Sequence, residues 1–167
     1  MSLEYGRNVI PHPTARRFRE AAERLDPDGL TATLDPNVIL HSPVSHRPYS
    51  GKATVGALLR LVSETFEFWR CSEEIVSESD LWGFVFKSRV GDRELEGIDL
   101  LRVGPSGLII ELTVMIRPLS GLILFGQILG QKTQAAGLEG VTAIPAENSC
   151  LAPGRFTGRQ QGEPDDG

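Results

Sequence analysis

Asp99 is the residue of this chain best placed to do chemistry, because it stands inside an otherwise apolar run. That run, 94–103, reads ELEGIDLLRV, and a Gly-Pro-Ser-Gly turn separates it from a second apolar run. The pair predicts a β-hairpin with Asp99 near the middle of its first strand. Gly97, Asp99 and Leu101 share one face of that strand, and the glycine leaves room beside the carboxyl. The sequence therefore predicts a pocket that contains one acid.

Two interpretations of Asp99 follow from these surroundings. Burial among apolar neighbours raises the pKa of a carboxyl, which would make Asp99 a hydrogen-bond donor or a general acid toward a carbonyl. Pairing with an arginine would instead keep Asp99 charged, and buried acids usually have such a partner. The first interpretation predicts a functional acid, and the second predicts a structural ion pair.

His41 is the second candidate for acid–base chemistry, because an imidazole titrates near neutral pH. It lies in a predicted strand at 38–42, which Pro43 ends. If Ser42 faces the pocket, alternation turns His41 to the opposite side unless a bulge precedes the proline. We predict Asp99 and His41 as catalytic residues, with a surface or subunit-contact histidine as the alternative for His41.

Apolar and aromatic side chains on several segments could form the wall of the pocket. Aromatic residues alternate along 81–90, and apolar residues alternate along 108–117. The same residues also suit an ordinary core, and only an unfilled volume separates the two interpretations. The predicted lining comprises Phe18, Ser42, Tyr49, Phe66, Trp69, Trp82, Phe84, Phe86, Gly97, Leu101, Leu112, Val114 and Ile116.

The elements that must position these residues change from helical to strand periodicity near residue 68. Helical spacing predicts a first helix, with Thr14 as its expected N-cap. A short turn of helix follows, and Asp35-Pro36-Asn37 is expected to end it. Alternation then predicts strands joined by tight turns, which should form an antiparallel meander. The predicted helices are 13–25, 30–34, 51–66 and 119–132, and the predicted strands are 38–42, 68–78, 81–90, 93–103 and 108–117.

This order of elements predicts an α+β fold. We expect a cone-shaped, curved antiparallel sheet covered by the N-terminal helices, with a C-terminal helix after the last strand. The predicted divisions are an N-terminal extension at 1–13, the cone domain at 14–136 and a tail at 137–167. The tail is rich in Gly, Pro and Ser, so we expect little order there.

The composition argues against several functional classes. The chain has 167 residues and a net charge of −5, with no basic stripe that would bind nucleic acid. No apolar stretch is long enough to span a bilayer, so we expect no membrane contact. Cys71 and Cys150 match no metal or redox spacing, which predicts free thiols in a reducing cytoplasm. We therefore expect a cytoplasmic protein that uses no metal and no cofactor.

Two sequence segments of the chain resemble the nuclear transport factor 2 (NTF2) superfamily, in its ketosteroid-isomerase-like and SnoaL-type polyketide-cyclase-like branch. They are 38–44 followed by Ser50-Gly51, and 97–102 followed by Gly107-Leu108-Ile109. The resemblance covers roughly residues 14 to 118. It implies the cone fold and a catalytic acid on the penultimate strand that hydrogen-bonds a substrate oxyanion, where Asp99 stands.

Other functional residues of this family do not match the chain. The general-base aspartate of the isomerases falls at Ser42 and their tyrosine falls at Phe18, and neither residue offers the same proton chemistry. The epoxide-hydrolase relatives need an arginine where Gly97 stands. The resemblance implies a cofactor-independent isomerase or cyclase that acts on an apolar, carbonyl-bearing metabolite through Asp99. The alternative is a non-catalytic small-ligand-binding or dimerisation module of the same fold.

One face of the last predicted strand has the composition of a subunit contact. Glu111, Thr113, Met115 and Arg117 share the face opposite the pocket, where an apolar centre has charged margins. We therefore expect a homodimer through the outer sheet face, and an apolar small molecule as the ligand.

Overall fold

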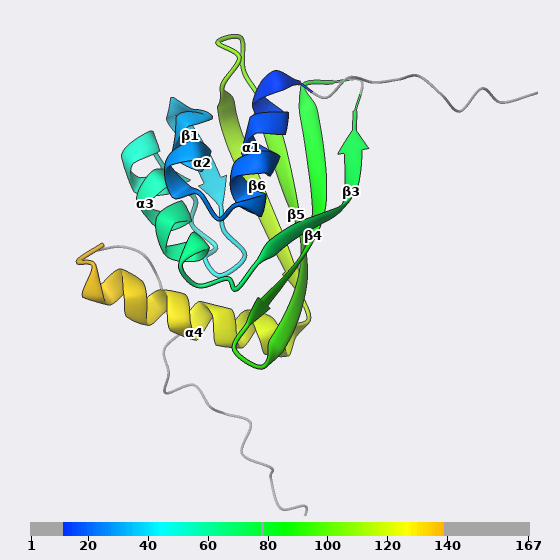
Figure 1. Cartoon of the computed structure of the whole chain (residues 1–167). Helices are drawn as coiled ribbons and strands as arrows, with labels where there is room; N and C mark the ends of the chain where they lie inside the picture. Colours follow the sequence, from blue (N-terminus) through cyan, green and yellow to red (C-terminus); the bar gives the residue numbers. More distant parts are fainter. Residues whose placement is uncertain (1–11, 78, 139–167) are drawn as a thin grey trace, which may run out of the picture.

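Three helices cover one face of a six-stranded sheet in the computed structural model, and a fourth helix lies across one end (Figure 1). The structure describes residues 12–77 and 79–138, so most of the predicted extension and tail lies outside the described residues. The helices are α1 (Pro13–Glu23), α2 (Pro27–Ala32), α3 (Lys52–Ser63) and α4 (Leu119–Ala135). The strands are β1 (Leu34–His41), β2 (Tyr49–Ser50), β3 (Trp69–Val76), β4 (Leu81–Val90), β5 (Arg93–Val103) and β6 (Ile109–Arg117).

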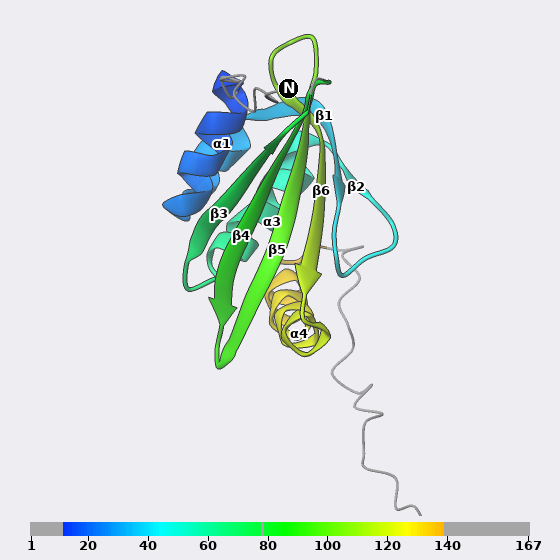
Figure 2. The same cartoon turned by 90° about the vertical axis from the view of Figure 1, so that its right-hand side faces the viewer.

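The sheet has the strand order β2-β1-β6-β5-β4-β3, and β3 to β6 form the predicted antiparallel meander. The predicted α+β fold is confirmed, with the sheet curved around the helices and its other face uncovered by any described helix (Figure 2). One pairing differs from the prediction, because β1 runs parallel to β6. The long connection between β1 and β6 holds α3 and three strands of the meander, which allows the chain to return in the same direction.

Two local predictions near the N-terminus are wrong. Asp35-Pro36-Asn37 does not end a helix but lies within β1, where the β1–β6 register shifts between Leu34 and Ile39. Such an irregularity tolerates a proline, because a residue outside the regular ladder does not need its N–H. The N-cap of α1 is His12 rather than Thr14, since the Nδ1 atom of His12 accepts a hydrogen bond of 3.1 Å from the backbone N–H of Thr14.

Side chains along β5 alternate between the core and the outer face. Leu95, Gly97, Asp99, Leu101 and Val103 are buried, while the residues between them are half-buried or exposed. This alternation is the period-2 pattern of a strand with one covered face. The predicted inward direction of Asp99 is therefore confirmed.

Helix α4 is fixed at both of its ends. Near its start, a Cβ atom on Gly121 would lie 2.3 Å from Cδ2 of Leu95, so the glycine permits close contact between the helix and β5. Near its end, the Lys132 ammonium donates a hydrogen bond of 2.8 Å to the backbone carbonyl of Glu64, which follows α3. The helix thus bridges the sheet and α3. Within the described residues, no helix is both long and apolar enough to cross a membrane.

Candidate active site

Asp99 lies in the middle of the sheet, and its side chain points toward the face that the helices cover. Its neighbours across the strands are Phe84 of β4 and Val114 of β6, and its exposed fraction is 6%. The carboxyl is therefore held by a central strand rather than by a loop, and its backbone has little freedom to move.

A small cavity of about 40 Å³ lies in front of the carboxyl. Its walls come from α1, α3 and the segments near them on one side, and from β3, β4 and β5 on the other. A volume of this size holds on the order of one to three water molecules. The lining residues are Phe18, Ala22, Leu25, Leu30, Leu59, Val62, Ser63, Phe66, Trp69, Phe86 and Asp99.

The electrostatic state of Asp99 is set by burial. Removal from water raises the pKa of the carboxyl to about 7, and a hydrogen bond from the Trp69 side chain opposes part of this rise. No Lys, Arg or His among the described residues forms a salt bridge with Asp99. The structure thus supports the first interpretation of Asp99, and the structural ion pair is not found. A carboxyl of this kind is partly protonated near neutral pH and can donate or accept a proton.

A second cavity of about 50 Å³ lies next to the first. Leu59, Val62 and Phe66 line both cavities. Ser42 supplies the polar side chain of the second lining, and its hydroxyl accepts a 3.3 Å hydrogen bond from the N–H of Val44. The lining comprises Leu40, Ser42, Pro43, Leu58, Leu59, Val62, Phe66, Val114, Ile116, Phe125 and Leu129.

The space beside Gly97 on the inner face of the sheet is not available to a ligand, so that part of the prediction is wrong. A Cβ atom on Gly97 would lie 2.4 Å from Cζ of Phe86 and 2.7 Å from the carbonyl oxygen of Met115. The Phe86 ring therefore fills the room that the missing side chain leaves. The glycine serves close packing, and the open volume near Asp99 lies toward α1 and α3 instead.

The structure does not bring His41 to Asp99. Its ring is on the outer face of the sheet, where Nε2 lies 3.1 Å from Oε1 of Glu111. Arg102 contacts the other oxygen of Glu111, with its Nε atom at 3.2 Å. Strand alternation places His41 there, because no bulge turns it inward before Pro43. The prediction of His41 as a catalytic residue is therefore corrected.

Seven of the remaining twelve predicted pocket residues line at least one of the two cavities, and five line neither. Phe18, Phe66, Trp69 and Phe86 line the Asp99 cavity, while Ser42, Phe66, Val114 and Ile116 line the second cavity. Tyr49, Trp82, Phe84, Leu101 and Leu112 line neither cavity, and the last three are core residues at most 1% exposed. The hydroxyl of Tyr49 and the indole N–H of Trp82 are buried without a hydrogen-bond partner in the described structure. The Trp82 ring lies instead near His12, with 5.3 Å between the ring centroids.

The sequence does not identify several residues that line the cavities, and it does not identify the role of Trp69. Leu59 and Val62 line both cavities, and Phe125 and Leu129 of α4 close the second. Their helical spacing marks them as buried, but it does not tell which cavity they face. The sequence predicts Trp69 only as an apolar wall, and its hydrogen bond to Asp99 depends on packing that no local pattern encodes.

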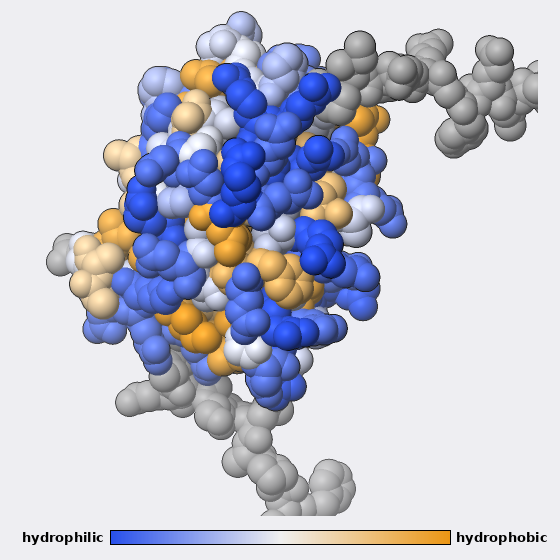
Figure 3. Space-filling view, viewed as in Figure 1, coloured by the Kyte–Doolittle hydropathy of each residue, from blue (hydrophilic) through white to orange (hydrophobic). Residues whose placement is uncertain are grey.

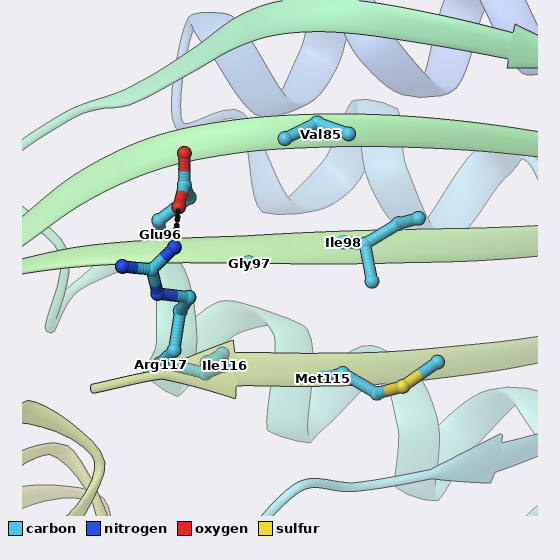
Figure 4. A pocket seen from close by; sticks show the side chains of 7 residues that line it. All are labelled: Val85, Glu96, Gly97, Ile98, Met115, Ile116 and Arg117. Carbon is cyan, nitrogen blue, oxygen red and sulfur yellow. Dashed lines mark hydrogen bonds and ion pairs between the residues drawn. The ribbon is translucent and has the colours of Figure 1, made fainter. Parts of the chain in front are cut away.

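The outer face of the sheet carries a separate, shallow hollow of about 290 Å³ (Figure 4). Its floor is apolar, with Val85, Ile98 and Met115 from three neighbouring strands. At one side Nη1 of Arg117 lies 2.9 Å from Oε2 of Glu96. No group of three or more His, Cys, Asp or Glu residues in the described chain could hold a metal ion.

The fold and the site together define a class: α+β cones with a buried acid in an apolar interior. The chain is similar to a steroid delta-isomerase from Pseudomonas aeruginosa, with 30% identity over 80% of this chain and 99% of that one, and a TM-score of 0.72. The chain belongs to the NTF2-like superfamily, as the two sequence segments at 38–44 and 97–102 indicate.

Two further solved structures have the same fold. One is an uncharacterised bacterial protein with a cystatin-like fold from Silicibacter pomeroyi, with 24% identity, coverage of 77% and 90%, and a TM-score of 0.73. The other is an NTF2-like protein of unknown function from Mesorhizobium loti, with 18% identity, coverage of 63% and 88%, and a TM-score of 0.56. No protein-family model and no curated protein matches the chain.

Proposed function

We propose that this protein is an isomerase or cyclase that acts on an apolar, carbonyl-bearing small molecule at the Asp99 cavity. The observation that carries the proposal is a buried carboxyl with no cationic partner among the described residues and a pKa of about 7. In its protonated form such a group donates a hydrogen bond to a carbonyl oxygen. The bond strengthens as that oxygen gains negative charge, and a water-poor site increases the effect.

The side chains around Asp99 define what each can contribute. The Trp69 indole donates a hydrogen bond to the carboxyl, and Asp99 also lines the cavity, where its carboxyl can hydrogen-bond a ligand. Ser42 can hydrogen-bond a ligand, but a serine hydroxyl does not accept a proton near neutral pH. The proposed chemistry is therefore polarisation of the carbonyl by Asp99 and proton relay through the same carboxyl.

The steroid delta-isomerase from Pseudomonas aeruginosa supports an isomerase, because the two chains are 30% identical. Ser42 and Phe18 favour a second candidate, a non-catalytic ligand-binding module. They stand where the resemblance places the general base and the tyrosine of the isomerases. Both candidates need the same ligand chemistry, and they differ in whether a product forms.

A thermal-shift screen of apolar ketones and lactones tests the proposal. We expect ketones to raise the melting temperature more than the hydrocarbons of the same shape do, and more at pH 6 than at pH 8. The reason is that a carbonyl needs the protonated form of Asp99, whose pKa is about 7. Hits are then assayed for conversion. Binding without any product would favour the module, and equal binding of ketones and hydrocarbons would contradict both candidates.

We further propose that two copies of the chain pair through the outer sheet face. Met115 and Ile39 are 48% and 39% exposed there, and Met115 lies with Val85 and Ile98 on the apolar floor of the outer hollow. The Glu96–Arg117 pair and the His41–Glu111–Arg102 cluster supply charged groups of both signs on this face. A two-fold contact brings each patch against its own copy, so a mixed-sign surface can complement itself.

The dimer is tested by Met115→Glu, measured by light scattering after size-exclusion chromatography. Two carboxylates at the centre of a two-fold contact would repel one another, so we expect this variant to elute as a monomer. Leu119→Glu is the matched control, because Leu119 is also exposed (69%) but begins α4. A monomeric wild type, or equal dissociation of both variants, would contradict the proposed contact.

A further inference from the structure

We infer that Phe66 is a movable partition between the two cavities and sets the longest ligand that reaches Asp99. The inference rests on the proposed function only in taking the Asp99 cavity as the ligand site. Each cavity alone, at about 40 and 50 Å³, is too small for a ring compound. The two share a wall, so displacement of that wall would create one elongated site.

The aromatic contacts of Phe66 place its ring at that shared wall. On one side it stacks on Phe125, which lines the second cavity, with 5.2 Å between centroids and 27° between planes. On the other side it tilts against Phe86, which lines the Asp99 cavity, at 6.1 Å and 49°. Phe86 in turn stacks on Trp69, the hydrogen-bond partner of Asp99. The ring therefore lies on the path from α4 to the acid.

The backbone at Phe66 is held by fewer regular hydrogen bonds than that of the other residues of the shared wall. Phe66 lies in the segment 64–68, between the end of α3 and the start of β3, outside any helix or strand. One backbone hydrogen bond, from its N–H to the carbonyl of Val62 at 3.0 Å, holds it to the last turn of the helix. Leu59 and Val62, the other residues of the shared wall, belong to α3 itself.

The opened site would accept a specific kind of molecule. At the inner end stand Asp99 and Trp69, which can hold one polar group. The body of the site is lined by apolar side chains of α3, β6 and α4, and Ser42 offers one hydroxyl at the outer end. Apolar side chains also gather at the surface in the seam between α4 and the helices above it (Figure 3). The inferred ligand is an apolar molecule longer than one ring, with one polar group held at its inner end by Asp99 and Trp69.

Hydrocarbons test the partition separately from the chemistry of Asp99, because they have no carbonyl. We compare toluene, with one ring, and naphthalene, with two, by thermal shift and by naphthalene fluorescence. Phe66→Ala should bind naphthalene at least about tenfold more tightly than the wild type, since the joined cavity buries the second ring. Phe66→Leu removes the ring but keeps a branched side chain, and it should give a smaller gain. This second variant keeps the test valid if Phe66→Ala does not fold.

Two control variants enlarge one cavity each without joining them. Of the two cavities, Leu30 lines only the Asp99 cavity and Leu129 lines only the second. Leu30→Ala and Leu129→Ala should therefore bind toluene more tightly than the wild type does, but not naphthalene. An equal naphthalene gain in Leu129→Ala, or no gain in either Phe66 variant, would overturn the inference. The gain should persist in Phe66→Ala combined with Asp99→Asn. If the wild type and Phe66→Ala, which both keep Asp99, show no preference for ketones while the naphthalene gain remains, the proposed function alone is contradicted.

Discussion

Replacement of Asp99 by Asn should lower kcat by a factor on the order of 10²–10⁴ on any apolar ketone that the wild type converts. Asn has nearly the shape of Asp, so the strand and the cavity should remain intact. Its amide can still donate a hydrogen bond, but it cannot give up a proton or take one back. The expected result is therefore a protein that folds and binds the ketone but turns it over very slowly.

The dependence of the wild-type kcat on pH is a second test of the same prediction. A carboxyl that works in its protonated form loses activity as pH rises through its pKa, which is about 7 here. We expect kcat to fall above neutral pH in the wild type and the residual rate of Asp99→Asn to lack that step. Asp92→Asn is the matched control, because it removes an exposed acid from the turn before β5. Turnover by Asp99→Asn at the wild-type rate would remove Asp99 from the mechanism.

Local pattern was sufficient to predict the strands that carry the acid. The bounds of β4 and β5 agree with their predicted ranges, because each strand alternates and glycine or aspartate residues form the turn between them. Alternation also indicates the inward direction of Asp99, and without a bulge it places His41 on the opposite face of the sheet. Period-2 geometry depends on neighbouring residues alone, so these features can be read directly from the chain.

The contents of the cavity could not be predicted in this way, because they depend on residues far apart in the sequence. Phe86 fills the space beside Gly97 from the adjacent strand, and Trp69 reaches Asp99 from two strands away. The parallel pairing of β1 with β6 is also a long-range choice. Packing of this kind is set by the volumes of all the side chains together. The sequence thus indicates where the acid points, but not how much room it has.

The stability of the protein should depend on Asp99 in a direction opposite to that of most carboxyls. Burial raises the pKa of this group from 3.8 to about 7, whereas the unfolded chain ionises near the lower value. Between these two pH values the folded state binds more protons than the unfolded state, so the free energy of unfolding falls as pH rises. Each tenfold difference between the two acid dissociation constants corresponds to about 1.4 kcal/mol, so the loss is about 4 kcal/mol, complete above about pH 7.

Asp99→Asn removes this destabilisation, since the amide stays neutral at every pH. Measured by urea unfolding, the stability of Asp99→Asn relative to the wild type should rise by about 4 kcal/mol between about pH 4 and pH 8. Asp92→Asn should show no comparable rise, because Asp92 is exposed and its carboxylate stays in water in the folded state. A constant difference between Asp99→Asn and the wild type would mean that the carboxyl is solvated or paired in solution. If the difference rises as expected, the gain in stability and the loss of turnover share one cause. That cause is a buried acid that is kept for its chemistry although it destabilises the fold.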